Sequence, residues 1–174
     1  MDFESNKMIK IIRKVVILAF LFFYFLPLIS KELTKKELIK TVQEADIYFY
    51  YDENFEKAAE LYEALINIYP ENPNFSAKLG ICYLNNDGKK ADALRLLSLA
   101  SKNVVSNDRE YIEYGDNAPL DTYLYLAIAY HRNDSLQKAL SIYYESKKRL
   151  GSTGIFREDY IDPQIMELNL LIQK

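Results

Sequence analysis

A chain of 174 residues has room for one compact domain and a short leader, and it is too short for two ordinary globular domains. Hydrophobic residues make up 49% and charged residues 27%, which excludes a disordered polar chain and a protein with several membrane spans. The net charge of -3 gives no electrostatic reason to bind nucleic acid or an anionic lipid surface.

Fifteen tyrosines, only five glycines and no tryptophan disfavour turn-rich β architectures. They favour helices that pack through aromatic rings. We therefore expect an all-α fold.

The N-terminal segment has the pattern of an export signal. The stretch from Val15 to Ile29 is uncharged and follows four basic residues, at positions 7, 10, 13 and 14. This apolar run has 15 residues, fewer than the roughly 20 that cross a bilayer comfortably. Residues 1–30 are therefore predicted to be a cleaved signal peptide, and the alternative is an uncleaved single anchor in the inner membrane.

The first seven residues do not fit this signal, because Asp2 and Glu4 place two acids in a region that should be basic. A start at Met8 gives a leader in which every charge is positive. The hypothesis is that residues 1–7 are dispensable for export.

After Lys31 amphipathic helical segments recur at a spacing of about 34 residues. Three blocks can be aligned, at about 39–72, 73–106 and 120–153. Such a spacing is typical of repeats in which each pair of helices packs on its neighbours.

The third block is the clearest. Its first helix carries large residues and its second helix small ones at the facing positions, so that two antiparallel helices can approach closely. These residues are Tyr123, Leu126, Ala127 and Tyr130, then Ala139, Tyr143 and Ser146. The block resembles the tetratricopeptide repeat in nearly every position.

The second block carries Gly80, which allows close backbone contact, and Asn86-Asp87-Gly88 as its turn. The first block is weaker in its first helix, whereas Pro70 ends its second helix clearly. The resemblance implies a tetratricopeptide-type solenoid over residues 37–174, with about three helix pairs.

Two segments interrupt or close the repeats. Residues 103–119 lack a sustained helical period and are expected to form a loop or a short extended insertion. Asp162 followed by Pro163 predicts the cap and first turn of a final helix at 162–174. This helix would cover the exposed end of the last pair.

The insertion gives a finer resemblance. The sequences LGICYLNNDGKKADALRLLSLASKNV and APLDTYLYLAIAYHRNDSLQKALSIYY flank it. The whole region is similar to the N-terminal repeats of Gram-negative envelope proteins that also carry a β-propeller-like domain and an OmpA-like domain. That resemblance implies a location in the periplasm or at the periplasmic face of the outer membrane.

Enzyme chemistry is not expected, because no nucleophile stands beside a recognisable base or acid. Cys82 and His131 are the only residues of their kinds, so neither a disulfide nor a zinc cluster can be built from them. Cys82 is expected to be a buried thiol. Carboxylates such as Glu60 and Glu63 are expected to be solvated and outside any pocket. No cofactor and no metal are expected.

The predicted function is therefore a non-catalytic protein–protein interaction scaffold of the cell envelope. Its partners are other proteins, and it meets a membrane only through the N-terminal segment. Lys78 alone occupies a position suited to gripping a partner's C-terminal carboxylate, so that mode of binding is not expected.

Binding is expected in a concave groove that takes a partner helix or an extended segment. The predicted protein-binding residues lie on the first helix of each block: Tyr50, Tyr51, Ile81, Leu84, Leu124, Ile128, His131 and Arg132. Five of them, Tyr51, Ile81, Leu84, Leu124 and Ile128, are expected to be exposed without a partner in the chain that the sequence identifies.

Overall fold

The structure is a computed structural model, and it describes residues 13, 14, 16, 34–105, 115–151 and 158–173. The chain divides into two compact units, Met1–Thr34 and Lys35–Lys174. The predicted signal segment lies almost wholly outside the described residues. Among the residues that are described, no helix combines the length and the apolar character needed to cross a bilayer.

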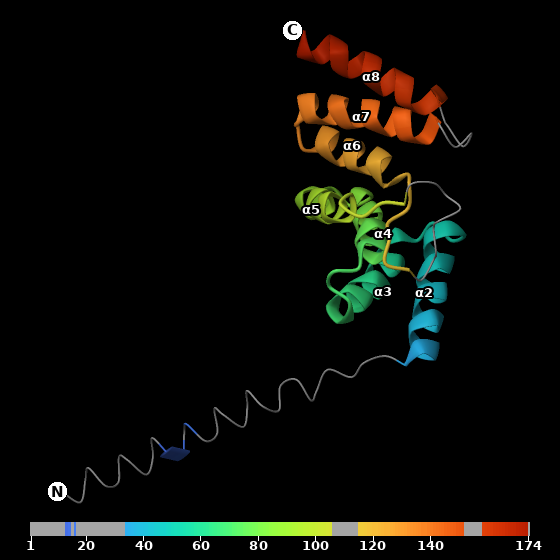
Figure 1. Cartoon of the computed structure of the whole chain (residues 1–174), viewed down its shortest axis with the longest axis vertical. Helices are drawn as coiled ribbons and strands as arrows, with labels where there is room; N and C mark the ends of the chain where they lie inside the picture. Colours follow the sequence, from blue (N-terminus) through green and yellow to red (C-terminus); the bar gives the residue numbers. More distant parts are fainter. Residues whose placement is uncertain (1–12, 15, 17–33, 106–114, 152–157, 174) are drawn as a thin grey trace, which may run out of the picture. The chain divides into compact units, whose positions relative to one another are not determined.

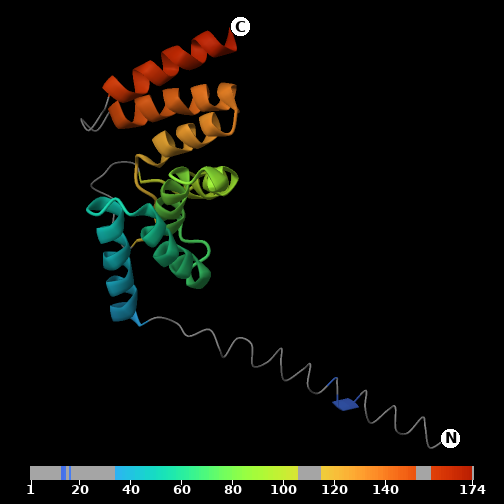
Figure 2. The same ribbon diagram turned by 180° about the vertical axis from the view of Figure 1, so that it is seen from behind.

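The described part of the second unit consists of seven α-helices and one short 3-10 helix, which confirms the all-α expectation there. In chain order they are α2 (Lys35–Tyr50), α3 (Phe55–Ile68), α4 (Pro73–Leu84), η2 (Asp87–Lys89), α5 (Lys90–Ala100), α6 (Thr122–Arg132), α7 (Leu136–Gly151) and α8 (Glu158–Ile172). Each helix packs on the next one along the chain, and the tightest partners are α4 with α5, α6 with α7 and α2 with α3. Figures 1 and 2 show the resulting stack from α2 to α8.

Asparagines begin the helices and turns of the first two pairs. The side chain of Asn54 accepts a hydrogen bond from the backbone N–H of Lys57 at 3.1 Å at the start of α3. Asn72 does the same for Phe75 at 3.0 Å, and Pro73 supplies the first residue of α4. These side chains satisfy N–H groups that have no partner within the helix. The local sequence therefore determines where both helices begin.

Gly80 lies where α4 and α5 are closest. A Cβ atom at this position would lie 2.7 Å from Cγ of Leu97, closer than real side chains approach one another. The expectation that Gly80 permits close contact between helices is confirmed. Because Gly80 has no side chain, α4 can pack directly against α5.

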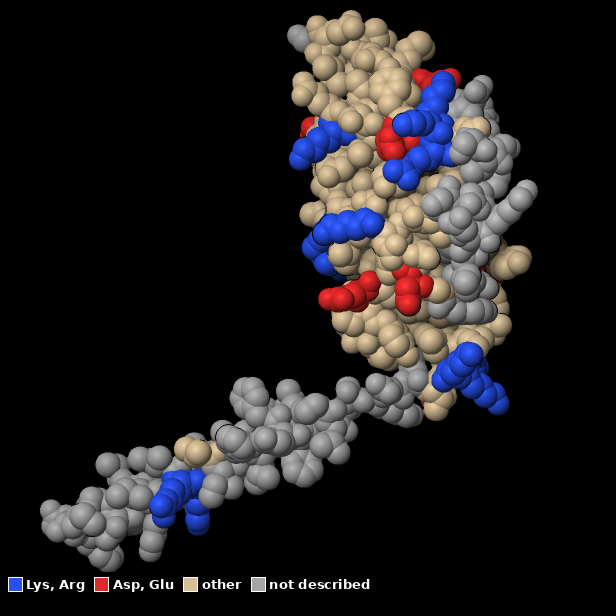
Figure 3. Space-filling view, viewed as in Figure 1, with Lys and Arg blue, Asp and Glu red and all other residues tan. Residues whose placement is uncertain are grey.

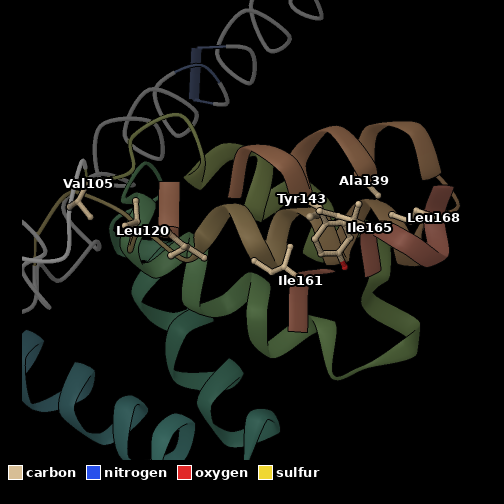
Figure 4. Packing of buried hydrophobic residues seen from close by; sticks show 9 residues of the cluster. Val105, Leu120, Ala139, Tyr143, Ile161, Ile165 and Leu168 are labelled. Atoms are coloured by element: carbon tan, nitrogen blue, oxygen red, sulfur yellow. The ribbon is translucent and has the colours of Figure 1, made fainter. Parts of the chain in front are cut away.

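The third pair and α8 share one hydrophobic core. Ala139 and Tyr143 of α7 are buried in it, and Ile161, Ile165 and Leu168 of α8 pack on the same cluster (Figure 4). The final helix therefore covers the last pair, as the apolar stripe of its sequence predicts.

The start of α8 differs from the prediction. The helix begins at Glu158, so Asp162 is not its cap and Pro163 lies inside the helix. The extra turn places Ile161 in the core, where it is fully buried. Burial of a large aliphatic side chain contributes about 1.5–3 kcal/mol, which favours the longer helix.

The described ends of the insertion lie beside the second pair. Residues 103–105 and 115–119 are non-helical, and Val105 donates a backbone hydrogen bond of 3.1 Å to the carbonyl of Ala118. Ala118 packs on Ala77 of α4 and Ala100 of α5. Both described ends of the insertion agree with the expected loop or short extended insertion, and residues 106–114 lie outside the described residues.

Candidate functional site

The predicted groove is not open along its length. Ile81 and Leu84 are only 7% and 5% exposed, so the expectation that they are free for a partner is wrong. Every residue of α4, Pro73–Leu84, is buried. A helix in the middle of the stack has neighbours on several sides, and the helical period alone does not reveal this. The second repeat therefore offers no exposed apolar strip.

The third repeat departs from the prediction in a similar way. Leu124 and Ile128 on α6 are half-buried and pack against the core cluster formed by α7 and α8. The intramolecular partner that the sequence did not reveal is thus the core of the final pair and its covering helix. Neither residue forms part of a free strip.

The first repeat keeps its exposed residues. Tyr50 is 55% and Tyr51 82% exposed, and Ile47, one turn earlier on α2, is 50% exposed. We call these three residues the α2 patch. Tyr50 and Tyr51 are predicted protein-binding residues, and Ile47 extends the large apolar surface that they present to solvent.

The ends of α4 and α6 are joined by polar side chains. Arg132 is exposed, yet its guanidinium donates a hydrogen bond to the carbonyl of Leu84. Asn133 donates one to the carbonyl of Lys90 at 3.0 Å. His131 is half-buried beside them. Arg132 therefore links two repeats, a role that the sequence prediction of a partner contact did not include.

A buried polar cluster lies next to the α2 patch. Lys78 Nζ of α4 is 2.7 Å from Asp46 Oδ1 of α2, and the side chain of Lys78 is 1% exposed. Tyr62 of α3 donates its hydroxyl to the same carboxylate oxygen. Burial, with Asp46 beside it, raises the pKa of Tyr62 above its usual range, so this hydroxyl keeps its proton.

The ring of Tyr50 connects the buried cluster to the surface. Lys78 Nζ lies 5.7 Å from the centroid of the Tyr50 ring and 5.8 Å from that of Tyr62. An ammonium group at this distance is attracted to the ring face. Tyr50 thus has an inward-facing role as well as exposed surface. Lys78 is engaged inside the fold, which agrees with the expectation that it does not grip a partner's carboxylate.

Two carboxylate residues of α3, Glu60 and Glu63, are exposed, as expected from the sequence. Glu60 and Glu63 line a hollow of about 390 Å³, whose other wall comes from the end of α4 and the following turn. Tyr83 donates its hydroxyl to Glu63, and Lys89 lies over the Tyr83 ring at 4.8 Å. Their solvent exposure is confirmed, whereas the hollow that they line was not expected from the sequence.

Cys82 is buried, as expected. Burial raises the pKa of its thiol to about 12 from 9.0. A thiol that keeps its proton at neutral pH is a poor nucleophile. Among the described residues, no group of three or more histidine, cysteine or acidic side chains is arranged to hold a metal ion.

Two features of this region were not predicted from the sequence. At the position of Asp46 the repeat pattern usually has a small residue. A charged residue there could have indicated a buried ion partner such as Lys78. The charges that pair lie 32 positions apart, close to the repeat length, and this spacing is the available signal. The hollow beside Glu63 has no comparable signal, because it depends on how two helices diverge.

Comparison with known proteins supports the repeat assignment. Residues 50–111 match the model of the tetratricopeptide repeat family. No curated protein and no solved structure matches the chain. The matched residues include α3, α4 and α5, and the helices before and after them continue the same pairwise packing. The described helices therefore form a tetratricopeptide-type helical-repeat solenoid, and repeats of this type generally bind other proteins.

Proposed function

We propose that this chain is an exported, non-catalytic scaffold of the cell envelope that binds a partner helix or extended segment of another protein. The export half of the proposal rests on the basic and apolar pattern of residues 1–30. The binding half rests on the repeat fold and on the surface of α2. The resemblance to repeats of OmpA-type envelope proteins supports the periplasmic face of the outer membrane as its location.

The observation that carries the binding proposal is the α2 patch. Large aromatic and aliphatic side chains in a cluster are enriched where proteins bind one another. Tyr50 is held in place by its contact with Lys78, so part of this surface is already ordered before a partner arrives. A pre-ordered aromatic surface loses little side-chain entropy on binding.

A site-specific crosslink tests the binding half. A photoreactive phenylalanine analogue placed at Tyr51 should form discrete adducts with a protein in living cells, because this side chain is 82% exposed. The same analogue at Leu99, a 36% exposed position on α5, is the control. Equal adduct patterns at both positions, or none at Tyr51, would remove the α2 patch from the proposal.

The export half has its own test. Fractionation of the cells, with the N-terminus of the mature chain read by mass spectrometry, should give a chain that begins near residue 31. A chain that retains residues 8–30 in the inner membrane would favour the alternative, an adaptor anchored by its uncleaved N-terminal helix and facing the periplasm. Recovery in the cytoplasm would contradict both locations.

A further inference from the structure

The α2 patch is one end of a longer exposed stripe on α2. Lys36, Lys40, Gln43, Ile47 and Tyr50 follow one another at intervals of four and three residues, and all five side chains are exposed. Residues at this spacing lie on one face of a helix, and it is the spacing with which two helices pack along each other. Figure 3 shows Lys or Arg side chains where α2 begins. The stripe is therefore basic at the start of α2 and apolar at its end.

The two lysines of the stripe do not stabilise α2 itself. Lys36 lies in the first turn, where the helix dipole disfavours positive charge. Lys40 follows it by four residues, and like charges at this spacing repel each other along a helix. Within the described part of the chain, neither ammonium group forms an ion pair. An arrangement that weakens the helix with no compensating contact in the fold is expected where side chains serve binding.

The other charges around the stripe are placed unevenly along α2. Glu44 is exposed at the edge of the stripe, so the two lysines have one carboxylate beside them. Asp52 and Glu53 are exposed in the turn that follows the α2 patch. Lys57 of α3 is exposed and lies over the ring of Tyr48, 5.1 Å from its centroid. The surface of α2 is thus mainly basic before the patch and carries two acidic residues directly after it.

We infer that the segment bound at the α2 patch is a helix of another protein with acidic side chains about two to three turns from its apolar anchor. This inference rests on the proposed binding at the α2 patch and adds the charge of the partner. Lys40 and Lys36 precede Ile47 by about 10 and 16 Å along the helix. Acidic side chains at these distances pair with the lysines while apolar side chains cover Ile47 and Tyr50. Complementary charges of this kind fix the direction in which a partner lies.

Two other occupants fit these charges less well. An anionic membrane surface lying along α2 would meet Asp52 and Glu53 as well as the lysines, and these carboxylates would be repelled by it. A second copy of this chain has its acidic residues in the wrong place. Asp52 and Glu53 directly follow Tyr50, so they cannot lie opposite Lys36 of another copy while the apolar residues of both are in contact.

A charge reversal combined with the crosslink at Tyr51 tests the inference in the full chain, in cells. Lys36→Glu together with Lys40→Glu replaces both ammonium groups, and the photoreactive analogue stays at Tyr51. We expect the yield of protein adducts to fall about three- to tenfold, because two attractive contacts with the partner become repulsive. The helix dipole favours a glutamate at position 36, so helicity and melting should stay close to those of the chain with both lysines.

The matched control is Lys102→Glu together with Lys148→Glu, which changes the net charge equally at two exposed positions outside α2. Its adduct yield should not change. A yield that the reversal at Lys36 and Lys40 leaves unchanged, or that falls equally in the control, overturns the inference, and the proposed binding at the α2 patch stands. Adducts that carry lipid or a second copy of this chain also overturn it. Absence of adducts from the chain with both lysines removes the α2 patch and the inference together.

Discussion

Lys78 Nζ on α4 lies 2.7 Å from Asp46 Oδ1 on α2, with both side chains buried. The pair joins the first helices of two successive repeats. A third side chain, Tyr62 from the helix between them, donates its hydroxyl to the same carboxylate oxygen. This cluster therefore fixes how the first repeat sits on the second.

Loss of the cation should be costly. Lys78→Met leaves the buried carboxylate of Asp46 without its ion partner, and removing one partner of such a pair typically costs about 3–5 kcal/mol of stability. Urea denaturation monitored by helicity would measure this loss. The double variant Asp46→Asn with Lys78→Met should lose less than Lys78→Met alone, because it removes the unpaired charge. A single variant as stable as the wild type would show that the pair contributes nothing.

Gly80 should not tolerate even a methyl group. The added Cβ of Gly80→Ala would lie 2.7 Å from Cγ of Leu97, so α4 and α5 must separate, and we expect a loss of about 1–3 kcal/mol. The matched control is Gly151→Ala at the end of α7, where nothing lies within 4 Å of the added atom. That change should be neutral or slightly stabilising. Equal melting temperatures for the two variants would contradict the close contact at Gly80.

The fold was predictable because it depends on short-range patterns. Repeat spacing, small residues such as Ala139 and Gly80, and turn residues such as Pro70 all act within about one repeat, and the helices follow them. The start of α8 was missed because the burial of Ile161, a long-range contact, outweighs the local preference for Pro163 in the first turn.

The binding surface was less predictable for the same physical reason. The helical period shows which residues share a face, but not what covers that face. Ile81 and Leu84 share the face of Tyr51 by period, yet they are buried within the stack. The hollow beside Glu63 depends on the separation of two helices, and no residue pattern encodes that separation directly.

As the pH rises above 9, the free energy of unfolding should fall, first through Cys82 and then through buried tyrosines. The folded state keeps the Cys82 proton up to a pKa of about 12, whereas the unfolded thiol loses it near pH 9. Between these values unfolding releases a proton, so stability falls by about 1.4 kcal/mol for each pH unit. Burial likewise raises the pKa of Tyr62 and Tyr143 from 10.0, so their contributions are lost only above pH 10.

Comparison with Cys82→Ala isolates the first step of this decline. Between pH 9 and pH 10 the free energy of unfolding of the wild type should fall more than that of the variant, by about 1 kcal/mol, because the unfolded thiol is already half ionised at pH 9. Denaturant titrations at the two pH values measure the difference. Above pH 10 both proteins should lose stability because the tyrosines remain. Parallel curves from pH 9 to pH 10 would mean that the thiol titrates normally in the folded chain.

A carboxylate should destabilise the fold at Ile128 and leave its stability nearly unchanged at Tyr51. Ile128 is half-buried and packs against the core of the third pair, so Ile128→Glu must desolvate a charge or open that core. We expect a loss of several kcal/mol.

Tyr51→Glu places the same charge at a side chain that is 82% exposed, so the free energy of unfolding should change by less than about 0.5 kcal/mol. If Tyr51 contacts a partner, only Tyr51→Glu weakens the complex while the domain stays folded. Helicity and melting of both variants, measured beside crosslinking in cells, distinguish these outcomes. A stable Ile128→Glu variant that loses its partner would restore Ile128 to the binding surface.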